Sequence, residues 1–159
     1  MRLKLLSLFA SLLLVAACGT SGDQISTADS DAAQTSGPSY EPGSEEEFIV
    51  EVGDRVFFGY NAYDLTTEAQ DTLSRQAEWL NTYPDSTILV EGHADERGTR
   101  EYNLALGEQR GNAVKNYLVA VGIDASRVEV ISYGKERPAV VGSNEGAWSR
   151  NRRGVSVIN

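Results

Sequence analysis

The sequence predicts a two-layer α/β domain, with two main helices on one face of a mixed four-stranded sheet, after a disordered tether. Apolar residues follow a strand pattern in four short segments and a helical spacing in two longer ones. These segments alternate as strand, helix, strand, helix, strand, loop and strand, an order typical of such domains. A chain of 159 residues with 41% apolar content can build one core.

The first strand and helix open the predicted domain. Residues 55–58 are predicted to form a strand, and Gly59-Tyr60-Asn61 follows as a bend. From Thr67, apolar residues recur every three or four positions, until Tyr83-Pro84 ends the helix.

The second strand, residues 87–91, has a continuous apolar centre and brings His93 and Asp95 to its C-terminal end. The remaining elements are, in chain order, a helix at 103–121 that stops at Gly122, a strand at 128–133, a long Gly-, Ser- and Asn-rich connection at 134–150 and a strand at 154–158.

Residues 1–17 have a short basic start, an apolar run and small residues at the end, the layout of a secretory signal peptide. Val15-Ala16-Ala17-Cys18 resembles a bacterial lipobox, in which Cys18 becomes a lipidated N-terminus; an ordinary signal peptide with an incidental cysteine is the alternative. Cys18 is the one cysteine of the chain, so no internal disulfide can form.

The segment 18–47 is rich in small and polar residues and ends in three glutamates. It cannot bury enough apolar surface to offset the entropy of ordering, so it predicts a disordered tether after the lipidated cysteine. The folded domain is then residues 48–159.

The charge of the chain argues against nucleic acid as a partner. Once the signal peptide is removed, 12 cationic residues face 23 carboxylates, a net charge of −11. Nucleic acid and anionic membrane surfaces bind clustered Lys and Arg instead.

Arg110 lies on the apolar face of its predicted helix, where an unpaired guanidinium would be destabilising. Three explanations are open. Arg110 could pair with Asp95 or another acid, could extend its head group to solvent, or could line a pocket and bind an external carboxylate, which suits its forked geometry.

Nothing in the sequence predicts an enzyme. There is no nucleophilic triad, no phosphate-binding glycine loop and no metal-ligand spacing, so neither a metal nor a cofactor is expected. His93 is the one histidine, and we expect a hydrogen-bonded structural role rather than a zinc or general-base role.

Several motifs together resemble one family. The segments are Glu91-Gly92-His93-Ala94-Asp95-Glu96-Arg97-Gly98-Thr99, Tyr102-Asn103-Leu104, Leu106-Gly107-Glu108, Arg110, Ser132-Tyr133-Gly134-Lys135-Glu136-Arg137-Pro138-Ala139 and Asn151-Arg152-Arg153. In order and spacing they are similar to the OmpA-like peptidoglycan-binding domain, in the variant of the peptidoglycan-associated lipoproteins.

The resemblance implies a binding site for the stem peptide of peptidoglycan, at meso-diaminopimelate. Asp95 would take the ligand's ammonium and Arg110 its carboxylate. The other residues implied in the site are Tyr60, Asn61, Arg97, Thr99, Asn103 and Leu106. Asn61 stands where the lipoproteins commonly have an aspartate, and Arg152 and Arg153 are expected to be structural ion-pair partners.

The resemblance further implies an outer-membrane lipoprotein with its domain in the periplasm. Such a protein would bind TolB and the Tol complex and would support envelope integrity and membrane invagination at cell division. Two rivals are a lipid-tethered cell-wall hydrolase, which would need a metal or a nucleophile, and a flagellar stator module, which would carry a membrane-spanning helix in place of the lipobox.

Overall fold

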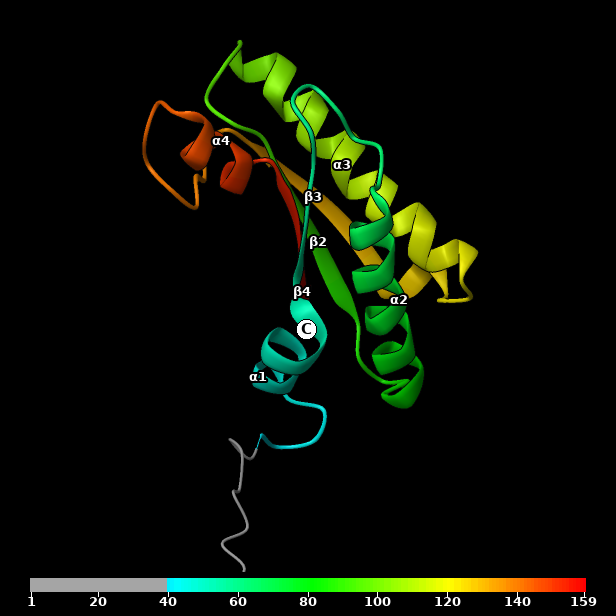
Figure 1. The fold of residues 1–159 in the computed structure, drawn as a ribbon. Coiled ribbons are helices and arrows are strands. Elements are labelled where there is room, and N and C mark those ends of the chain that lie inside the picture. The colour runs from blue at the N-terminus through cyan, green and yellow to red at the C-terminus, as the bar shows by residue number, and fades with distance from the viewer. Residues whose placement is uncertain (1–39) are drawn as a thin grey trace, which may run out of the picture. The chain divides into compact units, whose positions relative to one another are not determined.

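The computed structural model describes residues 40–159 (Figure 1). The predicted signal peptide, Cys18 and most of the predicted tether lie outside these residues. Within residues 40–159, no helix has both the length and the apolar character needed to cross a membrane.

The sheet has four strands in the order β1-β4-β2-β3. They are β1 (Arg55–Phe57), β2 (Ile88–His93), β3 (Val128–Gly134) and β4 (Arg153–Ile158). The last strand, β4, is antiparallel to both of its neighbours, whereas β2 and β3 are parallel. The predicted mixed sheet is confirmed, and its parallel pair brings the C-terminal ends of β2 and β3 to the same edge.

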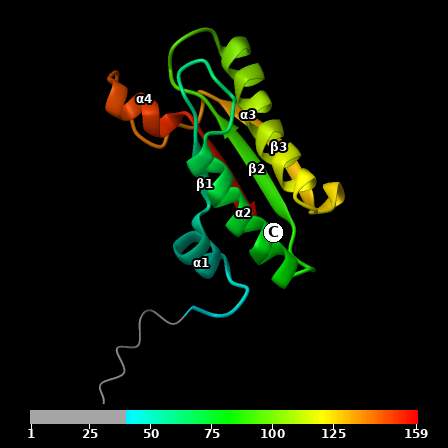
Figure 2. The same ribbon diagram turned by 45° about the vertical axis from the view of Figure 1, so that its right-hand side comes forward.

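Two long helices, α2 (Thr67–Thr82) and α3 (Arg100–Ala120), cover one face of the sheet (Figures 1 and 2). Helix α3 begins three residues earlier than predicted, because the Thr99 side chain accepts a hydrogen bond from the Tyr102 N–H and caps the helix there. The buried core between these layers includes Val56, Leu73, Leu80, Ile88, Val90, Val114 and Leu118. The predicted two-layer fold is therefore confirmed.

Glycines on α3 and β2 let the helix approach the sheet closely. A Cβ atom built on Gly92 of β2 would lie 1.8 Å from the Gly107 carbonyl oxygen. One built on Gly111 would lie 2.5 Å from a methyl group of Val130. The helix backbone therefore contacts the strand directly, and this contact fixes where α3 lies over the C-terminal end of β2.

The folded part begins before residue 48, where we predicted the domain boundary. Helix α1 (Glu45–Glu47) lies within the predicted tether, and a turn of π-helix, η1 (Phe48–Gly53), follows it. Glu47 accepts a hydrogen bond from the indole of Trp79 on α2, and Phe48 is completely buried. The prediction of a tether up to residue 47 is thus wrong for 45–47.

A second correction concerns the connection predicted over residues 134–150. It contains helix α4 (Glu145–Asn151), which is capped by the Asn144 side chain. The Asn151 amide accepts hydrogen bonds from the N–H groups of Ala139 and Val140 and donates to the Val140 carbonyl. Helix α4 therefore holds the preceding loop in place and leads directly into β4.

Candidate functional site

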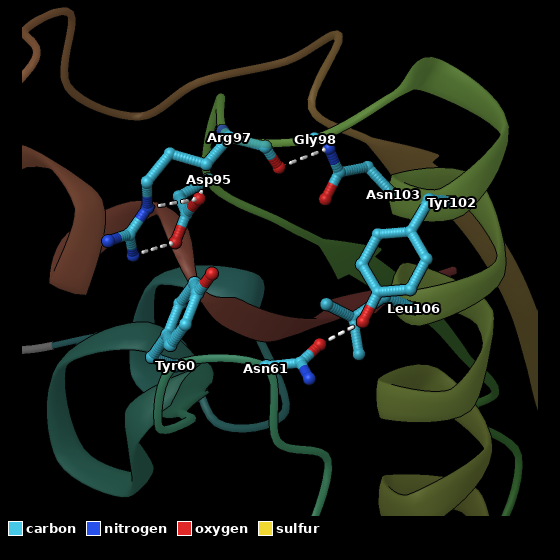
Figure 3. Close-up of a pocket in the computed structure, with 8 residues that line it drawn as sticks. All are labelled: Tyr60, Asn61, Asp95, Arg97, Gly98, Tyr102, Asn103 and Leu106. Atoms are coloured by element: carbon cyan, nitrogen blue, oxygen red, sulfur yellow. Dashed lines mark hydrogen bonds and ion pairs between the residues drawn. The ribbon is translucent and has the colours of Figure 1, made fainter.

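A pocket of about 180 Å³ opens where the C-terminal end of β2 meets the start of α3. Its walls come from the bend after β1, the loop after β2 and the first two turns of α3 (Figure 3). The lining residues are Tyr60, Asn61, Asp95, Arg97, Gly98, Tyr102, Asn103 and Leu106. Six of the eight residues that the sequence predicted are among them; Thr99 and Arg110 are not.

Asp95 is the buried anion of the pocket, with 5% of its surface exposed. Its Oδ2 accepts from Arg97 Nη2 at 2.7 Å and from Arg152 Nη1 at 3.4 Å. Its Oδ1 accepts from the Arg97 backbone N–H and from Nε, each at 3.1 Å. Burial alone would raise the pKa of Asp95, but these hydrogen bonds and the Arg97 charge outweigh it and lower that pKa, so the carboxylate is ionised at neutral pH.

Arg110 is completely buried and lies one turn of α3 after Leu106, a residue of the pocket lining. Its nitrogens donate to three backbone carbonyls: Nε to Ala62 at 2.8 Å, Nη1 to His93 at 2.7 Å and Nη2 to Gly59 at 3.1 Å. Burial lowers the pKa of Arg110 to about 10, partly offset by the Asp95 charge, so the guanidinium keeps its proton.

The sequence did not predict that backbone carbonyls are the partners of Arg110 in this structure. No ion pair joins Arg110 to an acid in the described part of the chain, and its head group does not reach solvent. Backbone carbonyls satisfy it instead. Three of the five N–H donors of a guanidinium are used, which leaves two.

The bend between the Gly59 and Ala62 carbonyls carries Tyr60 and Asn61 into the pocket wall. Asn61 has a positive φ of 51°, a conformation that Asn and Asp adopt more readily than other residues with side chains. The Tyr102 hydroxyl donates to Asn61 Oδ1 across the pocket mouth (Figure 3). Tyr102 and Gly98 are the two lining residues that we did not predict, although both stand in the motifs that indicated the site.

Asn103 and Thr99 shape the loop between β2 and α3. The Asn103 amide donates to the carbonyls of Arg97 at 2.9 Å and Thr99 at 3.0 Å. Thr99 itself caps α3 and lies outside the pocket lining. Its observed contact is therefore with the helix backbone, and it fixes the direction in which the loop enters α3.

Arg152 and Arg153 are both buried where α4 ends and β4 begins. Arg152 pairs with Asp95 and with Glu145, the latter at 2.6 Å, and donates to the Phe58 carbonyl at 3.0 Å. It thereby ties the end of β1 and the start of α4 to the pocket's carboxylate. Arg153 donates to backbone carbonyls of Asn151 and Arg137 and has no ion pair within 40–159, so the expectation of an ion-pair role holds for Arg152 alone.

His93 is buried at the end of β2, with 1% of its surface exposed. Its Nε2 lies 3.4 Å from a Glu91 carboxylate oxygen, and its Nδ1 has no hydrogen-bond partner in the described part of the chain. Burial, reinforced by the charges of Arg153 and Arg137, lowers the pKa of His93 to about 4, so it is neutral at pH 7. Within residues 40–159, no three His, Cys, Asp or Glu side chains gather as a metal site would require.

The chain is similar to known proteins over most of its length. Residues 57–152 match the OmpA family. A peptidoglycan-associated lipoprotein of Haemophilus influenzae is 43% identical over 152 residues, which cover 96% of this chain and 95% of that protein. One from Agrobacterium fabrum is 54% identical over 117 residues, 74% of this chain and 66% of its own length.

Solved structures show the same fold. The peptidoglycan-associated lipoprotein from Burkholderia pseudomallei, 39% identical, superposes with a TM-score of 0.65 over 67% of this chain and 90% of that one. The C-terminal domain of Helicobacter pylori MotB superposes with a TM-score of 0.62 at 18% identity, over 67% of this chain and 84% of its own. The second likeness concerns the fold alone.

Proposed function

The chain belongs to the OmpA family, and from that premise we propose that its folded domain binds peptidoglycan reversibly and without catalysis. The relatives are named peptidoglycan-associated lipoproteins, and the match to the Haemophilus influenzae protein covers nearly all of both chains. The ligand that we propose is the stem peptide, bound at meso-diaminopimelate.

The observation that carries this proposal is the charge distribution around the pocket. Asp95 is its buried carboxylate, whereas Arg110 and Arg152 are two buried guanidiniums next to it. The nearby carboxylates of Glu96 and Glu145 are exposed, so water screens them. The buried charges therefore favour a ligand that brings a carboxylate of its own.

The side chain of meso-diaminopimelate ends in an ammonium and a carboxylate on one carbon. In our proposal Asp95 takes the ammonium, and Arg110 takes the carboxylate with its two remaining N–H donors. The walls are Tyr60, Asn61, Arg97, Asn103 and Leu106. Asn61 offers an amide where the lipoproteins commonly offer a carboxylate, so it can hydrogen-bond the ligand without adding a negative charge.

We further propose that lipid on Cys18 anchors the protein in the outer membrane, with the domain in the periplasm. The protein would then link membrane and cell wall as part of the Tol-Pal system, with TolB as a partner, and would act in envelope integrity and division. The anchor rests on the lipobox and on the relatives' names, and the Tol-Pal role, TolB and division rest on the family resemblance alone.

Sedimentation with diaminopimelate-type peptidoglycan tests the proposal. Asp95→Asn should weaken binding by about 2–5 kcal/mol, because the ligand's ammonium would lose its counter-charge in a desolvated site. Asp71→Asn, the same change on the exposed side of α2, is the matched control and should bind as the wild type does. Equal binding by Asp95→Asn, or release of soluble muropeptides by the wild type, would contradict the proposal.

A further inference from the structure

The carboxylate of Asp95 has no free acceptor position in this structure. A carboxylate has about four lone-pair positions. Arg97 occupies three of them, through its backbone N–H, Nε and Nη2, and Arg152 occupies the fourth. An ammonium can therefore bind Asp95 only if one of these donors leaves.

Arg152 is the donor that cannot leave easily. Its side chain is buried, and its other nitrogens are held by the Phe58 carbonyl at 3.0 Å and the Glu145 carboxylate at 2.6 Å. Moving it would disconnect the end of β1 from the start of α4. The Arg97 side chain is 29% exposed and lines the pocket, and among residues 40–159 it has no hydrogen-bond acceptor other than Asp95. Arg97 is therefore the donor that can move.

Two aromatic rings hold the Arg97 guanidinium in its present position. Its Cζ lies 4.2 Å from the centre of the Tyr60 ring and 4.0 Å from that of Trp148 on α4. The Trp148 indole is in turn fixed by a 3.0 Å hydrogen bond to Glu96. Such cation–π contacts favour a planar, weakly hydrated cation. Figure 3 shows Arg97 reaching back to Asp95 beside Tyr60.

We propose that Arg97 is a specificity-determining residue, whose guanidinium occupies the place of the ligand's ammonium at Asp95 and is displaced when the ligand binds. This inference rests on the proposed function. A simple amine gains little by exchanging with a guanidinium that makes two charged hydrogen bonds and two ring contacts. A ligand that carries a carboxylate on the same carbon gains a second contact at the buried arginines, so the exchange favours the zwitterion.

Calorimetric titration of the purified protein tests the displacement. The two ligands are the tripeptide L-Ala-D-Glu-meso-diaminopimelate and the same peptide with its side-chain amine acetylated. Arg97→Gln should bind the free-amine peptide about tenfold more tightly than the wild type, because the competing charge is gone. It should show no such gain for the acetylated peptide, which has no ammonium to place at Asp95.

Arg100→Gln is the matched control for this variant. Arg100 lies three residues away and pairs with Glu136 at the surface, with 70% of its side chain exposed. The control removes the same charge without touching Asp95, so its affinity should stay within about twofold of the wild type. Equal or weaker binding of the free-amine peptide by Arg97→Gln would overturn the inference while leaving the proposed function intact. Absence of binding by the wild type would overturn both.

Tryptophan fluorescence gives a second readout that keeps Arg97 in place. The chain has two tryptophans, and Trp79 is buried against Phe48 and Tyr83. In a Trp79→Phe background the emission comes from Trp148 alone. The free-amine peptide should change this emission as the guanidinium leaves the ring, whereas the acetylated peptide should not. Unchanged emission at saturating free-amine peptide would overturn the displacement.

Discussion

Replacement of Arg110 by Ala should destabilise the domain more than any surface substitution. The change removes the donor for the carbonyls of Gly59, Ala62 and His93 and leaves a cavity where the buried side chain was. A hydrogen bond to a charged group contributes about 1.5–3 kcal/mol, so three would contribute about 4.5–9 kcal/mol if all were buried.

Solvent reduces that figure. Only the bond to the His93 carbonyl is fully buried; those to Gly59 and Ala62 are partly buried, and water can reach their carbonyls once the bend moves. We therefore expect a net loss of about 3–5 kcal/mol from a total stability of about 5–15 kcal/mol.

Urea unfolding followed by circular dichroism measures this loss. Arg110→Lys keeps the charge but lacks the fork that reaches three carbonyls, so it should recover only part of the stability. Arg100→Ala removes an exposed arginine from the same helix and should change the free energy of unfolding by less than about 1 kcal/mol. If Arg110→Ala also lost less than about 1 kcal/mol, the reasoning about the buried carbonyls would be refuted.

Three further outcomes are expected. Gly92→Ala should lower the free energy of unfolding by about 3 kcal/mol or more, because its methyl group would lie 1.8 Å from the Gly107 carbonyl oxygen. Gly59→Ala is the control, because the nearest contact of its methyl group is 3.5 Å. If Gly92→Ala were as stable as the wild type, the close packing would be contradicted. Because the pKa of His93 is about 4 in the folded protein, the unfolded chain binds more protons than the folded one between pH 6.5 and 4. The free energy of unfolding should therefore be at its full value above pH 6.5 and fall by about 3 kcal/mol as the pH drops to 4. In urea titrations, His93→Gln should reduce this dependence on pH. Cys18→Ala should abolish palmitate labelling in cells, and persistent labelling would exclude the lipobox.

The fold could be predicted from sequence because its long elements have strong periodic patterns. The apolar run at 87–91 and the helical spacing after Thr67 appear in the structure as β2 and α2. Helix α4 was missed because its seven residues lie in a stretch rich in Gly, Ser and Asn, with only Ala147 and Trp148 as apolar residues. Contacts of Asn151 and Arg152 with distant segments stabilise it, and such contacts cannot be predicted from the local sequence pattern.

The site was predicted in part. The family resemblance implied six of its lining residues, and the motifs that carry it also contain Tyr102 and Gly98, which we did not single out. The helical spacing of apolar residues correctly placed Arg110 on a buried helix face, where a guanidinium needs partners. Its partners could not be predicted, because two of the three carbonyls are 48 and 51 residues away in a bend whose position depends on the whole fold.

Recognition of the diaminopimelate carboxylate is the central claim of this account. Calorimetric titration with two stem peptides, one containing meso-diaminopimelate and one containing lysine in its place, tests it most directly, because lysine keeps the ammonium and lacks the carboxylate. We predict that the lysine peptide binds about 30- to 100-fold more weakly, the loss expected for one hydrogen-bonded charge. Equal affinity for the two peptides would contradict the role proposed for Arg110.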